Sequence, residues 1–236
     1  MVQLTPKQRQ VYKQQDQILS LFKKRKNFPF VLSGGTALSR FYLHHRFSED
    51  LDFFCEEPDF SFAKVELLMR GIGPFEMIGQ TNLPSRLKVA SYAAGKGLKI
   101  KVDFLEDPFS GMWNPTLKKA ESGLTFRVDS IEQIFYRKFY SLLEQYHQTN
   151  TITRFKDIID LYTLHSHYKK IGKVFDYYRK HNVSMNEEKI ILIFGQITKK
   201  QVQEGLNLIK VDASSEEIYR TLKEVSKKLM REGVAS

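Results

Sequence analysis

Two aspartates stand on either side of a leucine at Asp50-Leu51-Asp52, and the apolar residues Phe53 and Phe54 follow them. Successive side chains of a β-strand point to opposite faces, so a strand here would project both carboxylates from one face. Carboxylates held this close repel each other, and a divalent cation is the usual partner that relieves the repulsion. The pair therefore predicts a metal site, while a solvated strand end is the competing interpretation.

A third carboxylate stands near the end of a strictly alternating segment, residues 98–104. Every second residue of this segment is apolar, and the positions between hold Lys99, Lys101 and Asp103. A period of two predicts a strand whose apolar residues face a core and whose polar residues share the opposite face. Asp103 could complete the metal site or act as a general base toward an attacking hydroxyl.

Gly34 and Gly35 follow an apolar segment, residues 28–32, and precede Thr36. Because glycine has no Cβ, backbone N–H groups beside it can approach a phosphate closely. A helix predicted for residues 36–45 would direct its N-terminus, where N–H groups are unpaired, at that phosphate. The segment predicts a phosphate-binding turn, although two adjacent glycines also occur in turns without a ligand.

The C-terminal half carries further charged residues that could serve a nucleotide site. Lys138 interrupts an otherwise apolar helical pattern, and a buried lysine needs an anion. Arg154, Asp157 and Asp160 recur at intervals of three, which would place them on one helix face. The competing interpretation of this second group is a surface network of salt bridges, which would contribute little to stability.

The predicted elements that position these residues fall into two parts. Strands are expected at residues 28–32, 51–55, 75–79, 86–92 and 98–104. Helices are expected at residues 5–22, 36–45, 60–69, 130–145, 158–165, 174–178, 189–197 and 216–230. We therefore expect an α+β fold in which residues 1–112 form a mixed β-sheet core with flanking helices. Residues 113–236 are expected to form a helical bundle.

The composition is that of a globular protein with a basic surface. The 236 residues include 37 Lys and Arg against 27 Asp and Glu, a formal net charge of +10, which suits a polyanionic partner such as a nucleotide, RNA or DNA. No segment approaches the roughly 20 apolar residues that cross a bilayer, and the N-terminus has no signal-peptide pattern. Cys55 is the only cysteine. We expect a cytoplasmic protein without a membrane partner.

Taken in order, these motifs resemble those of the DNA polymerase β-like nucleotidyltransferase superfamily. More narrowly, they resemble the AbiEii/AbiGii nucleotidyltransferase-like toxin family. The segments that carry this resemblance are residues 34–38, 46–52, 101–103 and 154–161, together with Lys138. The resemblance spans residues 30–165, whereas residues 1–27 and 170–236 match no motif of the family.

The resemblance implies a Mg²⁺-dependent nucleotidyltransferase that moves NMP from an NTP to an acceptor, such as a tRNA 3′ end, with release of pyrophosphate. It implies catalytic roles for Asp50, Asp52, Asp103 and Lys138, and the three aspartates would bind one or two Mg²⁺ ions. The nucleotide-binding residues that it implies are Gly34, Gly35, Thr36, Arg46, Ser48, Lys101, Arg154, Lys156, Asp157 and Asp160. The helical part would close the nucleotide cleft.

The resemblance also implies a separately encoded antitoxin and a role in phage defence. Two other functions remain open at this point. The first is nucleotidyl transfer to a small molecule or a protein, which a screen of acceptors with labelled NTPs would distinguish from transfer to RNA. The second is NTP or RNA binding without catalysis, which the complete set of three carboxylates argues against.

Overall fold

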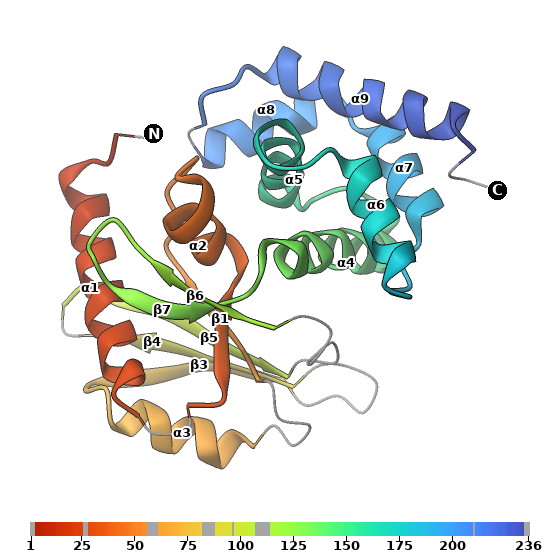
Figure 1. Cartoon of the computed structure of the whole chain (residues 1–236). Helices are drawn as coiled ribbons and strands as arrows, with labels where there is room; N and C mark the ends of the chain where they lie inside the picture. Colours follow the sequence, from red (N-terminus) through yellow and green to blue (C-terminus); the bar gives the residue numbers. More distant parts are fainter. Residues whose placement is uncertain are drawn as a thin grey trace. The chain divides into compact units, whose positions relative to one another are not determined.

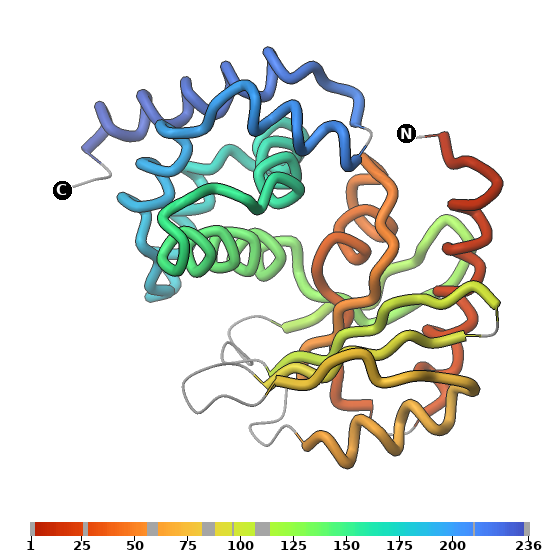
Figure 2. The backbone as a smooth tube through the Cα atoms, turned by 180° about the vertical axis from the view of Figure 1, so that it is seen from behind, coloured from red at the N-terminus to blue at the C-terminus, as the bar shows by residue number. Residues whose placement is uncertain are grey.

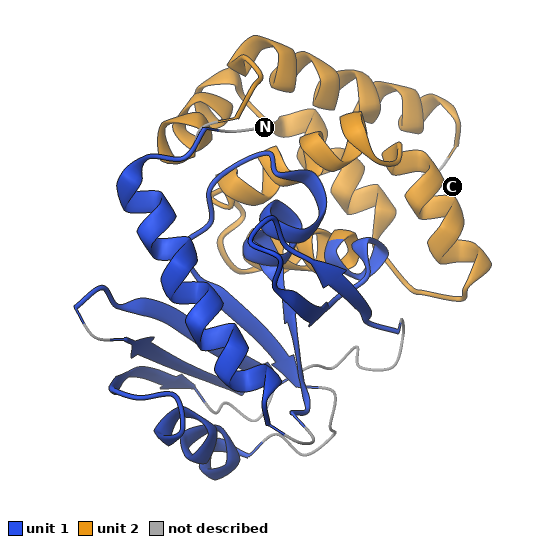
Figure 3. Cartoon of the chain, turned by 60° about the vertical axis from the view of Figure 1, so that its left-hand side comes forward, with its two compact units in different colours: residues 1, 3–134 blue, residues 2, 135–236 orange. Residues whose placement is uncertain are grey.

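The computed structural model describes residues 3–25, 28–55, 61–81, 88–95, 97–106, 114–209 and 211–233. The fold is of the mixed α+β class, as expected, and it divides into two compact units between Ile134 and Phe135 (Figure 3). The expected boundary at residues 112/113 lies outside the described residues. Strands β6 (Thr116–Lys119) and β7 (Thr125–Val128) join the sheet of the first unit.

The first unit contains a seven-stranded mixed sheet and its helices (Figure 1). Its strands are β1 (Phe30–Ser33), β2 (Leu51–Cys55), β3 (Phe75–Thr81), β4 (Val89–Ala94), β5 (Ile100–Glu106), β6 (Thr116–Lys119) and β7 (Thr125–Val128). Its helices are α1 (Pro6–Lys23), α2 (Gly34–Leu38), the π-helical turn η1 (Ser39–Leu43) and α3 (Phe62–Arg70). The strand order is β3-β4-β5-β2-β1-β7-β6, in which β2 runs parallel to β5 and β1 runs parallel to β7.

Aromatic packing against α1 determines which face of the central strands is buried. Phe53 of β2 pairs with Phe104 of β5, and their ring centroids lie 5.3 Å apart. Phe22 of α1 packs edge-on against both rings, at centroid distances of 5.2 and 5.9 Å. Because side chains alternate along a strand, the neighbouring register pair of Asp52 and Asp103 lies on the opposite face.

The start of α1 confirms the predicted capping pattern. Thr5 accepts a hydrogen bond from the backbone N–H of Gln8, and the Gln8 side chain accepts one from the backbone N–H of Thr5. Pro6 occupies the first helical position, where a missing N–H costs no hydrogen bond.

In the view from behind, the coil of α2 and η1 follows directly on β1 (Figure 2).

The second unit is helical. It contains most of α4 (Ile131–Thr149), then α5 (Phe155–His167), α6 (Ile171–Lys180), α7 (Glu187–Gln196), α8 (Lys199–Leu208) and α9 (Ser215–Arg231). Gly205 of α8 lets that helix approach α5 closely, since a Cβ there would lie 2.7 Å from Ile159 Cδ1 and 3.0 Å from Phe155 Cβ. No helix within the described ranges is long and apolar enough to cross a membrane.

Several elements differ from the expectations. Strands β6 and β7 and helix α8 were not predicted, and residues 86–87 of the fourth expected strand lie outside the described residues. β6 is largely exposed and therefore has no apolar alternation. Helix α8 has few buried residues, so its apolar stripe is weak. The helix expected at residues 36–45 begins at Gly34 and widens into a π-helical turn from Ser39.

We predict that Gly205→Ala lowers the free energy of unfolding by about 1–3 kcal/mol, because the added methyl group overpacks the contact between α5 and α8. In an uncrowded helix the same change would raise stability, since alanine is the better helix former. Urea denaturation measures the difference. Asn207→Ala, at an exposed position of α8, is the control and should stay within about 0.5 kcal/mol of wild type. A Gly205→Ala protein as stable as wild type would contradict the close packing.

Candidate active site

The glycine pair at the end of β1 lets two charged side chains approach the backbone. Gly34 has a φ of +68°, and a Cβ there would lie 2.2 Å from Asp52 Oδ2. A Cβ on Gly35 would lie 2.3 Å from Arg46 Nη2 and 3.0 Å from Ser48 Oγ. Any larger residue at these positions would displace the side chains of Asp52, Arg46 and Ser48, which therefore pack directly against the glycine turn.

The segment that leads into β2 is held by hydrogen bonds from two sides. Gln15 of α1 is fully buried, and its Nε2 donates to the carbonyl oxygens of Ser48 at 3.1 Å and Glu49 at 2.8 Å. The Thr36 hydroxyl, also fully buried, donates to the carbonyl oxygen of Asp50. These contacts position the backbone of Asp50 directly before the strand that carries Asp52.

Sequence reasoning missed Gln15 and its partner Arg40. Arg40 is almost fully buried, and its Nη1 donates to Gln15 Oε1 at 3.1 Å. The Arg40 guanidinium lies 4.4 Å from the centre of the Tyr12 ring and forms a salt bridge with Asp16. A signal for Gln15 does exist in the sequence, because it interrupts the apolar stripe of the first helix at a core position.

The polar face of β2 and β5 concentrates negative charge around one lysine. Asp103 is 9% exposed, and its Oδ2 accepts a hydrogen bond from Lys101 Nζ. Burial lowers the pKa of Lys101, but the hydrogen bond to Asp103 and the charges of the three aspartates outweigh burial and raise that pKa above its ordinary value. Lys101 therefore stays protonated beside Asp103.

The carboxylates fit Mg²⁺ by their chemistry, although they do not form an assembled cage. Among the described residues, no three His, Cys, Asp or Glu side chains are grouped as a metal site would require. Carboxylate oxygens are nevertheless the ligands that Mg²⁺ prefers. Asp103 Oδ1 is buried and has no hydrogen-bond partner among the described residues, so this oxygen is available as a ligand. Among the described residues, Asp103 therefore offers one free carboxylate oxygen, and Asp52 lies beside it in the register of β2 and β5.

The second unit contains a buried ion cluster on α4 and α5. Lys138 is 8% exposed, and its Nζ lies 2.5 Å from Asp157 Oδ1 and 2.9 Å from Asp160 Oδ2. The Ser141 hydroxyl donates to the other oxygen of Asp157 at 3.2 Å. The anion that the sequence led us to expect for Lys138 is thus supplied by two aspartates, both of which were expected to bind nucleotide.

The two remaining predicted residues lie at the surface. Arg154 precedes the first turn of α5, its side chain is 56% exposed, and its Nη1 lies 3.8 Å from Asp157 Oδ2. Lys156 is exposed. Within the first unit the structure therefore brings together residues of the glycine turn, the Arg46–Asp52 segment and β5. Within the second unit it brings together Lys138, Asp157, Asp160 and Arg154.

Comparisons with known proteins agree with this architecture. A family model described as "Nucleotidyl transferase AbiEii toxin, Type IV TA system" matches residues 19–228. The fold is similar to that of the JHP933 protein from Helicobacter pylori, with a TM-score of 0.56 and 18% identity over 99% of this chain and 97% of that one. It is also similar to the nucleotidyltransferase toxin MenT4 from Mycobacterium tuberculosis, with a TM-score of 0.56 and 17% identity over 94% and 84% of the two chains. No curated protein matches the chain.

We predict that Lys138→Met lowers the free energy of unfolding by about 3–5 kcal/mol, because it leaves two buried carboxylates without their cation. Thermal and urea denaturation both measure this loss. Lys156→Met removes an exposed cation from the same helix as Asp157 and should change stability by less than about 0.5 kcal/mol. Adding Asp157→Asn and Asp160→Asn to Lys138→Met should restore much of the loss. A Lys138→Met protein as stable as wild type would show that the cluster is not a stabilising ion pair.

Proposed function

This chain belongs to the AbiEii family of nucleotidyltransferase toxins, and we propose that it moves NMP from an NTP onto the 3′ end of an RNA, with Mg²⁺ as cofactor. The observation that carries the proposal is the register pair of Asp52 and Asp103 on the polar face of two parallel strands, with Lys101 beside it. A protein that only binds nucleotide has no need for a third carboxylate at this position.

In the proposed reaction the acceptor hydroxyl attacks the α-phosphorus of the NTP, the bond to the β-phosphate oxygen breaks, and pyrophosphate leaves. Asp50, Asp52 and Asp103 would hold Mg²⁺, which when bound stabilises charge on the attacking and leaving oxygens. Asp103 would also be the group that accepts the proton of the attacking hydroxyl. Lys101, whose pKa is raised, would remain charged and neutralise phosphate oxygens.

In the first unit, backbone N–H groups and side chains near the glycine turn would bind the phosphates of the nucleotide. Gly34, Gly35 and Thr36 would present backbone N–H groups to the phosphates, with Arg46 and Ser48 adjacent to the turn. From the second unit, the family pattern adds Lys138, Arg154, Lys156, Asp157 and Asp160. Arg154 and Lys156 are exposed cations, which suits contact with a soluble triphosphate. Lys138 would contact phosphate while it remains shared by its two carboxylates.

RNA, and tRNA in particular, is the proposed acceptor. The chain carries a net charge of +10, which suits a polyanion, and the 3′ end of an RNA has the hydroxyl that would attack the NTP. The cytoplasm, where tRNA is abundant, is the proposed location. The family description, a type IV toxin–antitoxin system, supports a separately encoded antitoxin as a further partner. Phage defence is the proposed setting.

We predict that Asp103→Asn lowers the rate of nucleotidyl transfer by at least about 10²-fold, since it removes both a metal ligand and the proposed base. NTP binding should be largely retained. The assay incubates each α-³²P-labelled NTP with Mg²⁺ and total bacterial RNA, and the label is followed on a denaturing gel. Glu106→Gln makes the equivalent amide change on the same strand and should leave transfer within about twofold of wild type.

Two results of this assay would contradict the proposal. Transfer by Asp103→Asn at the wild-type rate would remove Asp103 from the chemistry. Label from wild type in a small molecule or in protein, with none in RNA, would assign a different acceptor to the same site.

A further inference from the structure

Helix α6 and the residues at its two ends carry a strong excess of positive charge. Between His167 and Asn182 the chain has five Lys or Arg residues and one carboxylate, Asp176. Helix α6 buries an apolar stripe made of Ile171, Val174, Phe175 and Tyr178. Because 3.6 residues make one turn, Lys173 and Lys180 lie on the side of the helix opposite that stripe.

Aromatic rings alternate with cations on this part of the second unit. The Tyr168 side chain is 45% exposed, and its ring lies 6.5 Å from that of buried Phe135. Lys169 Nζ lies 5.5 Å from the centre of the Tyr168 ring and 5.0 Å from that of Tyr177. The exposed His181 ring lies 4.1 Å from the Tyr177 ring at an interplanar angle of 33°. Tyr177 thus supports His181 from one side.

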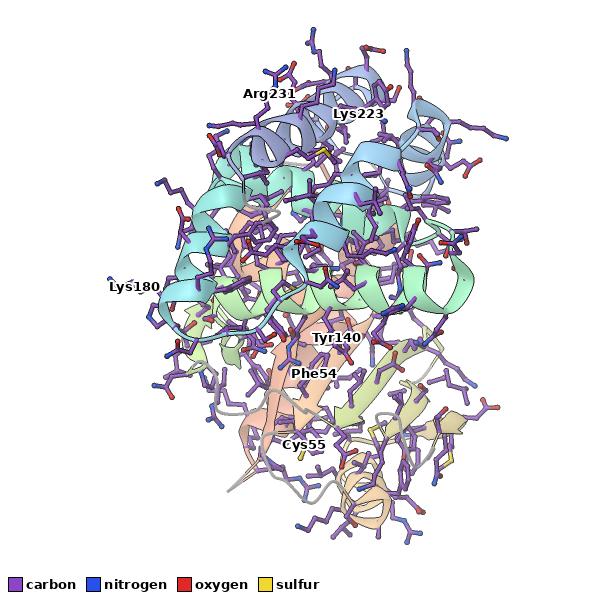
Figure 4. All side chains as sticks on the ribbon, turned by 90° about the vertical axis from the view of Figure 1, so that its right-hand side faces the viewer. Phe54, Cys55, Tyr140, Lys180, Lys223 and Arg231 are labelled. Atoms are coloured by element: carbon purple, nitrogen blue, oxygen red, sulfur yellow. The ribbon has the colours of Figure 1, made fainter. Side chains whose placement is uncertain are left out.

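We use the name α6 surface for Tyr168, Lys169, Lys173, Tyr177, Lys180 and His181. Its positive charge is only partly compensated. Asp176 is shared between Lys173, at 3.5 Å, and Arg179, at 2.7 Å, and Arg179 also pairs with Glu187. Within the described part of the chain Lys180 forms no salt bridge, and Figure 4 shows it projecting outward from the end of α6.

We infer that the α6 surface binds the RNA acceptor of the proposed reaction, an inference that rests on the proposed function. Lys173 and Lys180 contact phosphates, whereas the exposed rings of Tyr168 and His181 stack unpaired bases. Cations alone would suit any polyanion, including an acidic protein. Cations interleaved with exposed aromatic rings are the combination that binds single-stranded nucleic acid, because every base offers a π-face and every nucleotide a phosphate. RNA is the single-stranded nucleic acid that the proposed reaction supplies.

The phosphate part of this inference is tested by Lys173→Gln/Lys180→Gln in the full chain. Each phosphate contact contributes about one unit to the slope of log affinity against log salt concentration, so the double variant should reduce the slope for bulk tRNA by about 2. Fluorescence anisotropy at several salt concentrations measures the slope. Lys200→Gln/Lys227→Gln removes two exposed lysines from α8 and α9 and should leave the slope unchanged.

The stacking part is tested by Tyr168→Ala and His181→Ala with a single-stranded oligonucleotide. Each should weaken binding by roughly tenfold, as the loss of one base-stacking contact does. Tyr168→Phe keeps the ring and should bind as wild type, which separates stacking from the hydroxyl group. Equal weakening of RNA and poly-L-glutamate by the lysine variant, with no effect of either alanine variant, would overturn the inference in favour of an acidic protein partner.

Transfer assays on the same proteins separate this inference from the proposed function. If wild type labels RNA and Lys173→Gln/Lys180→Gln raises KM for RNA with kcat unchanged, both stand. If wild type labels RNA and the double variant has the wild-type KM and salt slope, the inference is overturned and the proposed function stands. If wild type labels no RNA, the proposed function fails, and with it the assignment of the bound RNA as acceptor.

Discussion

Negative charge concentrated on one face of the sheet is the constraint on which the rest of the first unit depends. Asp52 and Asp103 are neighbours because β2 and β5 run parallel in that register, and Asp50 stands directly before β2. Carboxylates this close repel each other unless a cation lies among them. Lys101 supplies one such charge through its contact with Asp103. We propose that the same negative charge would hold Mg²⁺, and that the triphosphate would bind through that cation.

Other contacts of the first unit hold these carboxylates in place despite the repulsion between them. The ring cluster of Phe22, Phe53 and Phe104 fixes the register, since a slip of β2 by one residue would turn Asp52 into the core. Gln15 and Thr36 hold the segment that leads into β2, because they donate hydrogen bonds to its carbonyl oxygens. Apolar packing and buried hydrogen bonds thus offset the electrostatic cost of the site.

Local patterns predicted the carboxylates but not the groups that hold them. Alternation along residues 98–104 was sufficient to place Asp103 on the polar face, because period two is a property of one strand alone. Gln15 contacts residues more than thirty positions away, and that pairing depends on how α1 crosses the sheet. The exposed strand β6 carried no apolar signal, and the partners of Lys138 depended on how α4 and α5 pack. Long-range contacts of this kind have no periodic signature in a single sequence.

The central claim is that Asp52 and Asp103 bind a divalent cation for nucleotidyl transfer. The most direct test is Mn²⁺ binding, followed by electron paramagnetic resonance, in the presence of an NTP analogue that cannot be cleaved between its α- and β-phosphates. We predict that wild type binds Mn²⁺ tightly and that Asp52→Asn/Asp103→Asn, folded as judged by circular dichroism, loses this binding. Equal Mn²⁺ binding by the folded double variant and wild type would contradict the claim.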